Sequence, residues 1–361
     1  MVRKTTFFIT ILIFILLVNA CAPAATPTPA VEENLSSVDL SGIKTYLLGK
    51  SAELKSSSQA LREASDKYYT LAQSSEFDYQ ALWAGNSAEV STVLNNAKSA
   101  WMAASPLYEQ MEGIVAGTPS LAEYDVILDA GASGEEDPEN AVPFDLTLPD
   151  GRILPKPGNL FGVLESTLWG TDADYTTGIE ADLDGNGTID FGEKLPDANV
   201  LKAGADTLDK YVTELDAAAS SWVPTQSDAF TALVVMVPTM SEYFNSWKNS
   251  RFILGEESEQ RDFVVISRLA DIQNILGSLQ IVYGEVQPLV ESADAAQAAQ
   301  IEQGLEDLKA FVAEVHAKEQ GGYQHTPEEA DVLGAEAQNR ATAIAGQVAQ
   351  IAAKLNIKIE E

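Results

Sequence analysis

The sequence predicts an all-α protein built from two antiparallel helical bundles. Apolar residues recur every three or four positions over long stretches, which is the period of a helix that buries one face. Few stretches alternate with the period of two that is typical of strands. Most connections between the helical stretches are short, which favours antiparallel neighbours packed end to end or side by side.

The first residues have the composition of a signal peptide. Arg3 and Lys4 precede an apolar run over residues 7–18, which is too short to span a bilayer of roughly 30 Å, and the run leads through a small residue to Cys21. Since Cys21 is the only cysteine of the chain, we expect it to carry lipid; an ordinary signal peptide with an incidental cysteine is the alternative. We therefore predict an extracytoplasmic protein, anchored in a lipid bilayer, either the cell membrane or the outer membrane.

Composition limits the partners of the chain. Residues 1–21 are the expected lipoprotein signal peptide, and residues 22–37 are a tether that begins rich in Pro, Thr and Ala and cannot bury apolar surface. The chain carries 54 acidic and 22 basic side chains, for a net charge of −32. A field of this sign repels phosphate backbones, so nucleic acid is excluded as a partner.

The helical pattern begins after the tether. Leu40, Ile43 and Leu47 open a predicted helix over 38–72, and a second helix fits 88–115. Gly, Pro and acidic residues then accumulate over 117–158, which predicts a long loop with a short hairpin around Asp150 and Gly151. Residues 159–169 are apolar enough for a short buried helix. We assign 38–170 to the first helical bundle.

A polar segment, 171–195, separates this bundle from the next run of helices. We assign 196–361 to a second bundle, with helices over 198–219, 226–249, 262–286, 293–319 and 327–355. The last helix is preceded by Thr326, with Pro327 and Glu329 after it, which is a capping sequence.

Within the polar segment, residues 182–193 match every position of the twelve-residue EF-hand pattern. Calcium prefers about six to eight oxygen ligands, and the alternating polar residues of the loop direct oxygens into one centre while Gly187 permits the sharp turn. Thr188 would contribute its backbone carbonyl, and Glu193 both carboxylate oxygens. The candidate calcium ligands are Asp182, Asp184, Asn186, Thr188, Asp190 and Glu193. A solvated acidic turn without metal is the alternative.

The residues that flank this loop are poor helix formers. Thr176, Thr177 and Gly178 precede it, and Gly192 and Pro196 fall at its end. We therefore expect the flanking helices to be short or absent, and calcium to order segment 171–195 rather than switch the protein.

A second group of carboxylates is a candidate metal site. Glu109 and Glu112 lie three residues apart on one helix face, and Glu165 lies in an apolar helix, where an acid needs a partner or a proton. If Glu165 meets Glu109 or Glu112 between helices, a cation site or a shared proton follows. If Glu165 faces water, neither follows.

One apolar run, 161–170, is accompanied by five short motifs at 108–109, 112–115, 121–125, 247–251 and 267–271. The run resembles the signature helix of the imelysin-like family, which includes the EfeO-type components of bacterial iron uptake, and the five motifs support that resemblance. The resemblance covers about residues 38–355, and it implies a double four-helix bundle, a cell-envelope location and a metal-binding His-x-x-Glu pair, with links to iron acquisition and to a peptidase activity.

This chain departs from the family pattern at the implied metal site. Gly162 stands at the position of the expected histidine, so only Glu165 of the pair remains. His316 and His325 lie far away in the sequence, and we expect ordinary surface roles for them. Zinc chemistry of the hydrolase kind is therefore poorly supported.

We accordingly expect a non-enzymatic, metal-binding lipoprotein. Its cofactors would be Ca²⁺ and, at Glu109, Glu112 and Glu165, iron or another transition metal; its partner would be a transporter or another envelope protein. Two alternatives stay open from the sequence. One is a metal-dependent envelope peptidase, and the other is a structural or adhesive surface protein made rigid by calcium.

Overall fold

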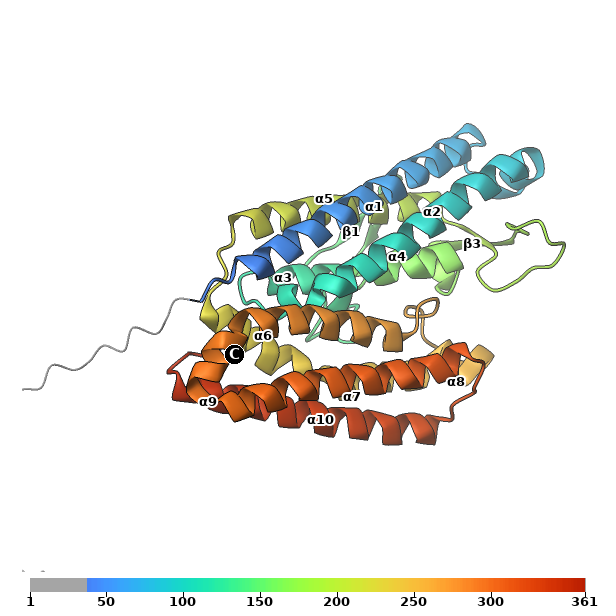
Figure 1. The fold of residues 1–361 in the computed structure, drawn as a ribbon. Helices are drawn as coiled ribbons and strands as arrows, with labels where there is room; N and C mark the ends of the chain where they lie inside the picture. The colour runs from blue at the N-terminus through green and yellow to red at the C-terminus, as the bar shows by residue number, and fades with distance from the viewer. Residues whose placement is uncertain (1–37, 361) are drawn as a thin grey trace, which may run out of the picture. The chain divides into compact units, whose positions relative to one another are not determined.

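The structure is a computed structural model that describes residues 38–360. The predicted signal peptide, the predicted lipidation site at Cys21 and the predicted tether lie outside the described residues. Residues 38–360 belong to one compact unit, and the structure confirms the all-α helical-bundle fold (Figure 1). None of the helices in this range combines the length and the apolar character that crossing a bilayer requires.

Four helices form the first bundle. They are α1 (Ser41–Ser74), α2 (Tyr79–Val115), α4 (Leu160–Trp169) and α5 (Ala198–Ser221). Helix α1 packs between α2 and α5, and α4 packs against α5 and α2. The side chains of Leu47, Leu54 and Leu61 recur at helical spacing along the buried face of α1.

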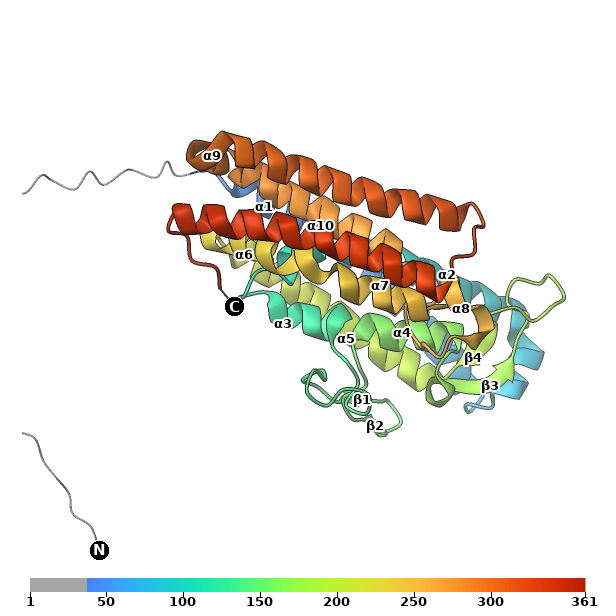
Figure 2. The ribbon, with the colours of Figure 1, turned by 90° about the horizontal axis from the view of Figure 1, so that it is seen from below.

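The second bundle is formed by the C-terminal helices. They are α6 (Gln226–Met236), α7 (Met240–Asn249), α9 (Arg268–Gln320) and α10 (Pro327–Lys354), with the 3₁₀ turn η3 (Val237–Thr239) joining α6 to α7. The backbone of α9 leaves helical geometry at Asp294, so its two halves act as two helices of the bundle. Helix α10 packs against α6, α7 and α9. Figures 1 and 2 show this bundle lying along the first one.

The two bundles meet mainly where α2 packs against α9. Gly113 of α2 makes close approach possible there, because a Cβ at this position would lie 2.5 Å from Ser278 Oγ and 2.9 Å from Leu279 Cγ. Since α2 contributes buried residues on both of its faces, its C-terminal half serves as a shared wall between the bundles.

The bundle boundary differs from the one expected from the sequence. We placed 196–361 in the second bundle, whereas α5 packs against α1 and α4 of the first. The chain returns from the polar segment directly onto α1, where Tyr68 Oη donates to the carbonyl of Pro196 over 2.9 Å. Periodicity identifies a helix, but it does not identify the neighbour of that helix.

Two helix boundaries also differ from expectation. Helix α2 begins at Tyr79 rather than residue 88, because Asp78 caps it by accepting from Ala81 N. Non-helical geometry at Asn86 shifts the phase of the apolar pattern there. Helix α9 begins at Arg268 rather than residue 262, after a cap by Ser267.

The connection between α2 and α4 carries several short elements. Helix α3 (Ala122–Asp125) and the π-helical turn η1 (Val126–Ala130) are followed by the antiparallel pair β1 (Leu146–Thr147) and β2 (Ile153–Leu154). This pair is the expected hairpin. Gly151 turns it with φ +90°, a conformation that favours glycine.

The polar segment after α4 forms a second hairpin. The 3₁₀ turn η2 (Ala173–Tyr175) leads into β3 (Thr176–Glu180), which pairs antiparallel with β4 (Lys194–Pro196). The twelve-residue loop 182–193 joins these strands. The elements flanking the loop are therefore strands, not helices. The connection between α7 and α9 contains α8 (Arg251–Leu254) and the 3₁₀ turn η4 (Gly255–Glu257).

Candidate functional site

A buried cluster of carboxylates lies where the two bundles meet. Glu109 and Glu112 come from one face of α2, and Asp129 comes from the turn η1; one carboxylate oxygen of each lies within 4.8 Å of the others. Their exposed fractions are 2%, 2% and 4%. Ionised carboxylates this close and this buried require a cation or protons.

The polar partners of the cluster leave part of it unsatisfied. Tyr243 Oη donates to Glu112 Oε1 over 2.5 Å, and Arg268 Nη1 lies 3.7 Å from Glu109 Oε1. Glu109 Oε2 and Glu112 Oε2 are buried and have no hydrogen-bond partner among the described residues. These two oxygens are available to a ligand.

Arg268 is held firmly beside the cluster. Its Nη1 donates to Asp271 Oδ2 over 2.9 Å. Its guanidinium carbon lies 4.5 Å from the ring centroid of Tyr243 and 3.8 Å from that of Phe263. Contact with two aromatic rings stabilises the buried guanidinium in this position.

One guanidinium does not balance the carboxylates around it. Burial raises the pKa values of Glu109 and Asp129 well above their usual range, and neighbouring carboxylates add to the effect while Arg268 opposes it. Burial also raises the pKa of Asp125 to about 8, although the hydrogen bond from Tyr108 Oη lowers it. Burial therefore favours the protonated forms of Glu109 and Asp129, and a bound cation would displace those protons.

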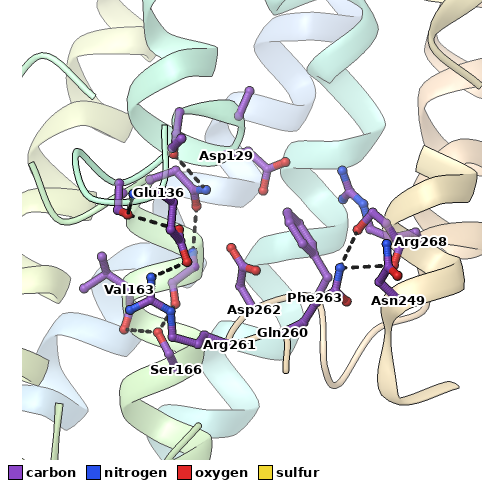
Figure 3. Close-up of a pocket in the computed structure, with 18 of the residues that line it drawn as sticks. Asp129, Glu136, Val163, Ser166, Asn249, Gln260, Arg261, Asp262, Phe263 and Arg268 are labelled. Carbon is purple, nitrogen blue, oxygen red and sulfur yellow. Dashed lines mark hydrogen bonds and ion pairs between the residues drawn. The ribbon is translucent and has the colours of Figure 1, made fainter. Parts of the chain in front are cut away.

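A cavity of about 810 Å³ is lined by two members of the cluster, Glu112 and Asp129. Figure 3 shows the side chains of Asp129, Asp262 and Arg268 among its walls. Acidic side chains outnumber basic ones among its lining residues in the described chain. The acidic residues are Glu112, Asp125, Asp129, Glu136, Asp172, Glu242, Glu257, Glu259 and Asp262, and the basic ones are Arg261 and Arg268. Such a wall attracts cations.

Gly162 also lines this cavity. A Cβ at Gly162 would lie 2.7 Å from Asp262 Oδ2. The side chain of Asp262 therefore occupies the space beside α4 into which a histidine at position 162 would extend. The carboxylate of Asp262, which comes from another part of the chain, thus lies where the expected histidine side chain would be.

Glu165 does not belong to the three-carboxylate cluster. Its carboxylate, which is 1% exposed, accepts hydrogen bonds from the backbone N–H groups of Phe263, Val264 and Val265 at 2.6, 2.9 and 3.0 Å. Burial raises the pKa of Glu165 to about 8, and these three donors favour the ionised form. The structure thus brings Glu109 and Glu112 together with Asp129, in the place where we expected Glu165.

Asp129, Tyr243 and Arg268 are site residues that we did not predict from the sequence. Asp129 lies in a π-helical turn within a segment that reads as loop. Arg268 and Asp271 lie in one of the motifs quoted for the family resemblance. Their i, i+3 spacing is the sequence feature that could have indicated an ion pair on one helix face.

The loop 182–193 brings its acidic side chains close together. Oxygens of Asp182, Asp184 and Glu193 lie within 4.8 Å of one another. Asn186 Nδ2 donates to Asp184 and to Asp190, and Thr188 Oγ1 contacts Asn186 and Asp190. All six predicted ligands therefore lie in one turn.

Two side chains of α2 fix the loop to the first bundle. Asn95 Nδ2 donates to the carbonyl of Leu183 over 3.0 Å, and Lys98 Nζ donates to that of Gly192 over 2.7 Å. The ring of Trp169 lies against Gly192, where a Cβ would be 2.4 Å from Trp169 Cδ1. The base of the loop is thus packed, while its tip is exposed.

Neither histidine lies at the cavity. His316 Nδ1 contacts Gln273 Nε2 at 2.8 Å. His325 packs against the rings of Trp247 and Tyr323. His325 is 7% exposed, so it is a buried residue rather than the surface residue that we expected.

Comparison with known protein families assigns this chain to one of them. The model described as Imelysin matches residues 44–355, most of the chain. No curated protein matches.

We expect the metal-free protein to lose stability as the pH rises from about 5 to about 8. The folded state keeps the proton of Asp125 up to a pKa of about 8, whereas the unfolded chain releases it near pH 4. Because the folded state binds more protons over this interval, the free energy of unfolding falls as the pH rises. Urea titrations at pH 5, 6.5 and 8 should show a decrease of at least about 1.4 kcal/mol, the equivalent of one pKa unit.

The Asp125→Asn variant should reduce this dependence without abolishing it, since it keeps an acceptor for Tyr108 and removes one of the buried carboxyls whose pKa is raised, while Glu165 remains. The exposed Glu63→Gln should leave the slope unchanged. Stability that is constant or that rises over the interval in the unmodified protein would contradict the expectation.

Proposed function

Because this chain belongs to the imelysin family of metal-associated envelope proteins, we propose that it binds a metal cation at Glu109, Glu112 and Asp129 and has no enzymatic activity. The observation that carries the proposal is the pair of buried oxygens, Glu109 Oε2 and Glu112 Oε2, that have no hydrogen-bond partner in the described chain. A buried acceptor without a partner is costly. A cation from the cavity would satisfy both.

The donor set supports a hard cation. All three clustered ligands are carboxylates, and Tyr243 adds an oxygen beside them. Oxygen donors suit Mg²⁺, Ca²⁺ and Mn²⁺ more than thiolate-seeking metals, and Fe³⁺ is hard by the same criterion. We therefore keep iron among the candidates and infer a role related to iron uptake, in which the protein presents the cation to a transporter or another envelope protein.

A zinc peptidase is less well supported by these residues. Catalytic zinc sites commonly use histidine ligands together with a position open to water. His316 and His325, the two histidines of the chain, lie away from the cavity. The acidic cavity is better suited to binding and release of a cation than to polarising a peptide bond.

We also propose that loop 182–193 binds calcium and acts as a local clip. Its six ligands lie in one turn, and Asn95 and Lys98 hold its base against α2. Strands rather than helices flank it, so calcium binding has no pair of helices to reorient. Its affinity should be weak, on the order of 10⁻⁴ to 10⁻³ M, as in other extracellular sites.

Lipid at Cys21 would hold this protein on the outside of a membrane. The support is the sequence alone: a short apolar run followed by a lone cysteine. One acyl chain gives only marginal membrane binding, whereas several chains on one cysteine give stable anchoring.

The cavity site predicts a loss of cation binding when ligands are neutralised. Glu112→Gln and Asp129→Asn should each weaken the binding of Mn²⁺ or Fe²⁺ to full-length protein in detergent by at least about tenfold, equivalent to 1.4 kcal/mol. Isothermal titration calorimetry would measure it. Glu259→Gln, at an exposed position of the cavity wall, is the matched control and should change the affinity less than about threefold. Equal affinities in all four proteins would refute the site.

The calcium loop predicts a stability gain that depends on its ligands. At a calcium concentration of a hundred times Kd, the free energy of unfolding should rise by about 2.7 kcal/mol. Asp182→Ala should remove this gain, whereas Asp174→Asn, just outside the loop, should retain it. A gain that survives Asp182→Ala would place the calcium elsewhere.

The anchor predicts a membrane-bound protein whose mature N-terminus is a lipid-modified Cys21. In the cells that produce the protein, Cys21→Ser should move it from the membrane fraction to the soluble fraction. Mass spectrometry of the N-terminal peptide checks the modification. An unmodified Cys21 in membrane-bound protein would contradict the proposal.

A further inference from the structure

We propose that Glu165 is a positioning residue: it holds segment 261–265 against α4 and thereby fixes Arg268 and Asp262 beside the carboxylate cluster. The inference rests on the proposed cation site and concerns how that site is kept in shape. Glu165 would contribute to cation binding without contacting the cation.

The contacts of Glu165 are all with the backbone of one segment. Oε2 accepts from Phe263 N, while Oε1 accepts from Val264 N and Val265 N. Three consecutive N–H groups converge on one carboxylate, an arrangement in which protein backbone binds anions strongly. Because Glu165 belongs to α4 and the segment leads into α9, these bonds tie the first bundle to the second.

The segment depends on this tie for its conformation. Residues 261–265 lie outside the regular elements, between η4 and α9. Phe263 has φ +53°, in the left-handed region that a bulky residue rarely adopts. Such a backbone persists only where its surroundings hold it, and the hydrogen bond from Phe263 N to Glu165 is part of that hold.

Three successive side chains of the segment face the cavity. Arg261 donates to Asp172 Oδ2 over 2.6 Å and to Glu136 Oε1 over 2.5 Å. Asp262 fills the space over Gly162. Phe263 lies against Arg268, whose guanidinium carbon is 3.8 Å from the ring centroid; Figure 3 shows the two side chains next to each other.

Arg268 is the link between the segment and the cluster. It donates to Asp271 and lies 3.7 Å from Glu109 Oε1. Without Phe263 against it, the guanidinium would be free to move toward Glu109 and Glu112, where it would compete with a cation for the same oxygens. Loss of Glu165 should therefore weaken cation binding while leaving every ligand in place.

The test separates a positioning residue from a ligand. Terbium(III) is the probe, bound to full-length protein in which Asp182→Ala and Glu193→Gln disable the calcium loop. Its luminescence lifetimes in H₂O and D₂O give the number of water molecules bound to the ion. Glu165→Gln should lower the terbium affinity by about tenfold or more, because the glutamine NH₂ group cannot accept from the backbone donors, and the number of bound waters should stay unchanged.

Two further variants provide comparisons for Glu165→Gln, one at a proposed ligand and one at a second positioning residue. Glu112→Gln removes a proposed ligand, so it should lower the affinity and add about one bound water. Phe263→Gly removes the ring from Arg268 and tolerates the left-handed backbone, so it should reproduce the affinity loss of Glu165→Gln. The double variant should lose little more than either single one, since both act through the same contact. Additive losses, unchanged affinity or an extra bound water in Glu165→Gln would overturn the proposal.

Amide hydrogen exchange tests the tie without any metal. In metal-free protein, Glu165→Gln should speed exchange at Phe263, Val264 and Val265 by about tenfold or more, and leave exchange in α10 unchanged. Unchanged rates at the three amides would refute the positioning role whether or not a cation binds. Faster exchange together with no terbium binding to the unmodified cluster would instead refute the proposed cation site and keep the tie between Glu165 and the segment.

Discussion

Burial of like charges at the contact between two helical bundles is the constraint on which this structure depends. Glu109 and Glu112 occupy the face of α2 that meets α9, a position where helices of most bundles bring apolar side chains together. The cost of that burial is offset only in part by Arg268 and by the hydroxyl of Tyr243. The neighbouring elements surround this incompletely compensated group of carboxylates, which is the basis of the proposed cation site.

The residues around the buried carboxylates come from the connections between helices as much as from the helices themselves. The turn η1 supplies Asp129, and the segment before α9 supplies Asp262 and Phe263. Connections tolerate the irregular backbone that such placement needs, while the bundles keep their ends fixed. Rigid helices thus hold the walls of the cavity, and short irregular segments complete its lining.

The sequence was sufficient for the fold class and for part of the site. Helical periodicity identified most of the helices, because each buries one regular face. It did not assign α5 to the first bundle, because nothing in a helix pattern specifies which neighbour will cover it. The i, i+3 spacing of Glu109 and Glu112 predicted their proximity, whereas Asp129 required a π-helical turn. The backbone N–H donors that engage Glu165 leave no mark in a sequence, since every residue except proline carries one.

The loop 182–193 leaves the bundle and returns to it at nearly one place. Thr176 of β3 pairs with Pro196 of β4, so the chain enters and exits the hairpin side by side. An excursion of this kind can lengthen, shorten or disappear with little effect on the helices beneath it, because the closure entropy of a loop changes slowly with its length. The loop is thus separable from the rest of the architecture, and relatives with the same bundles and no calcium motif at all are compatible with this fold.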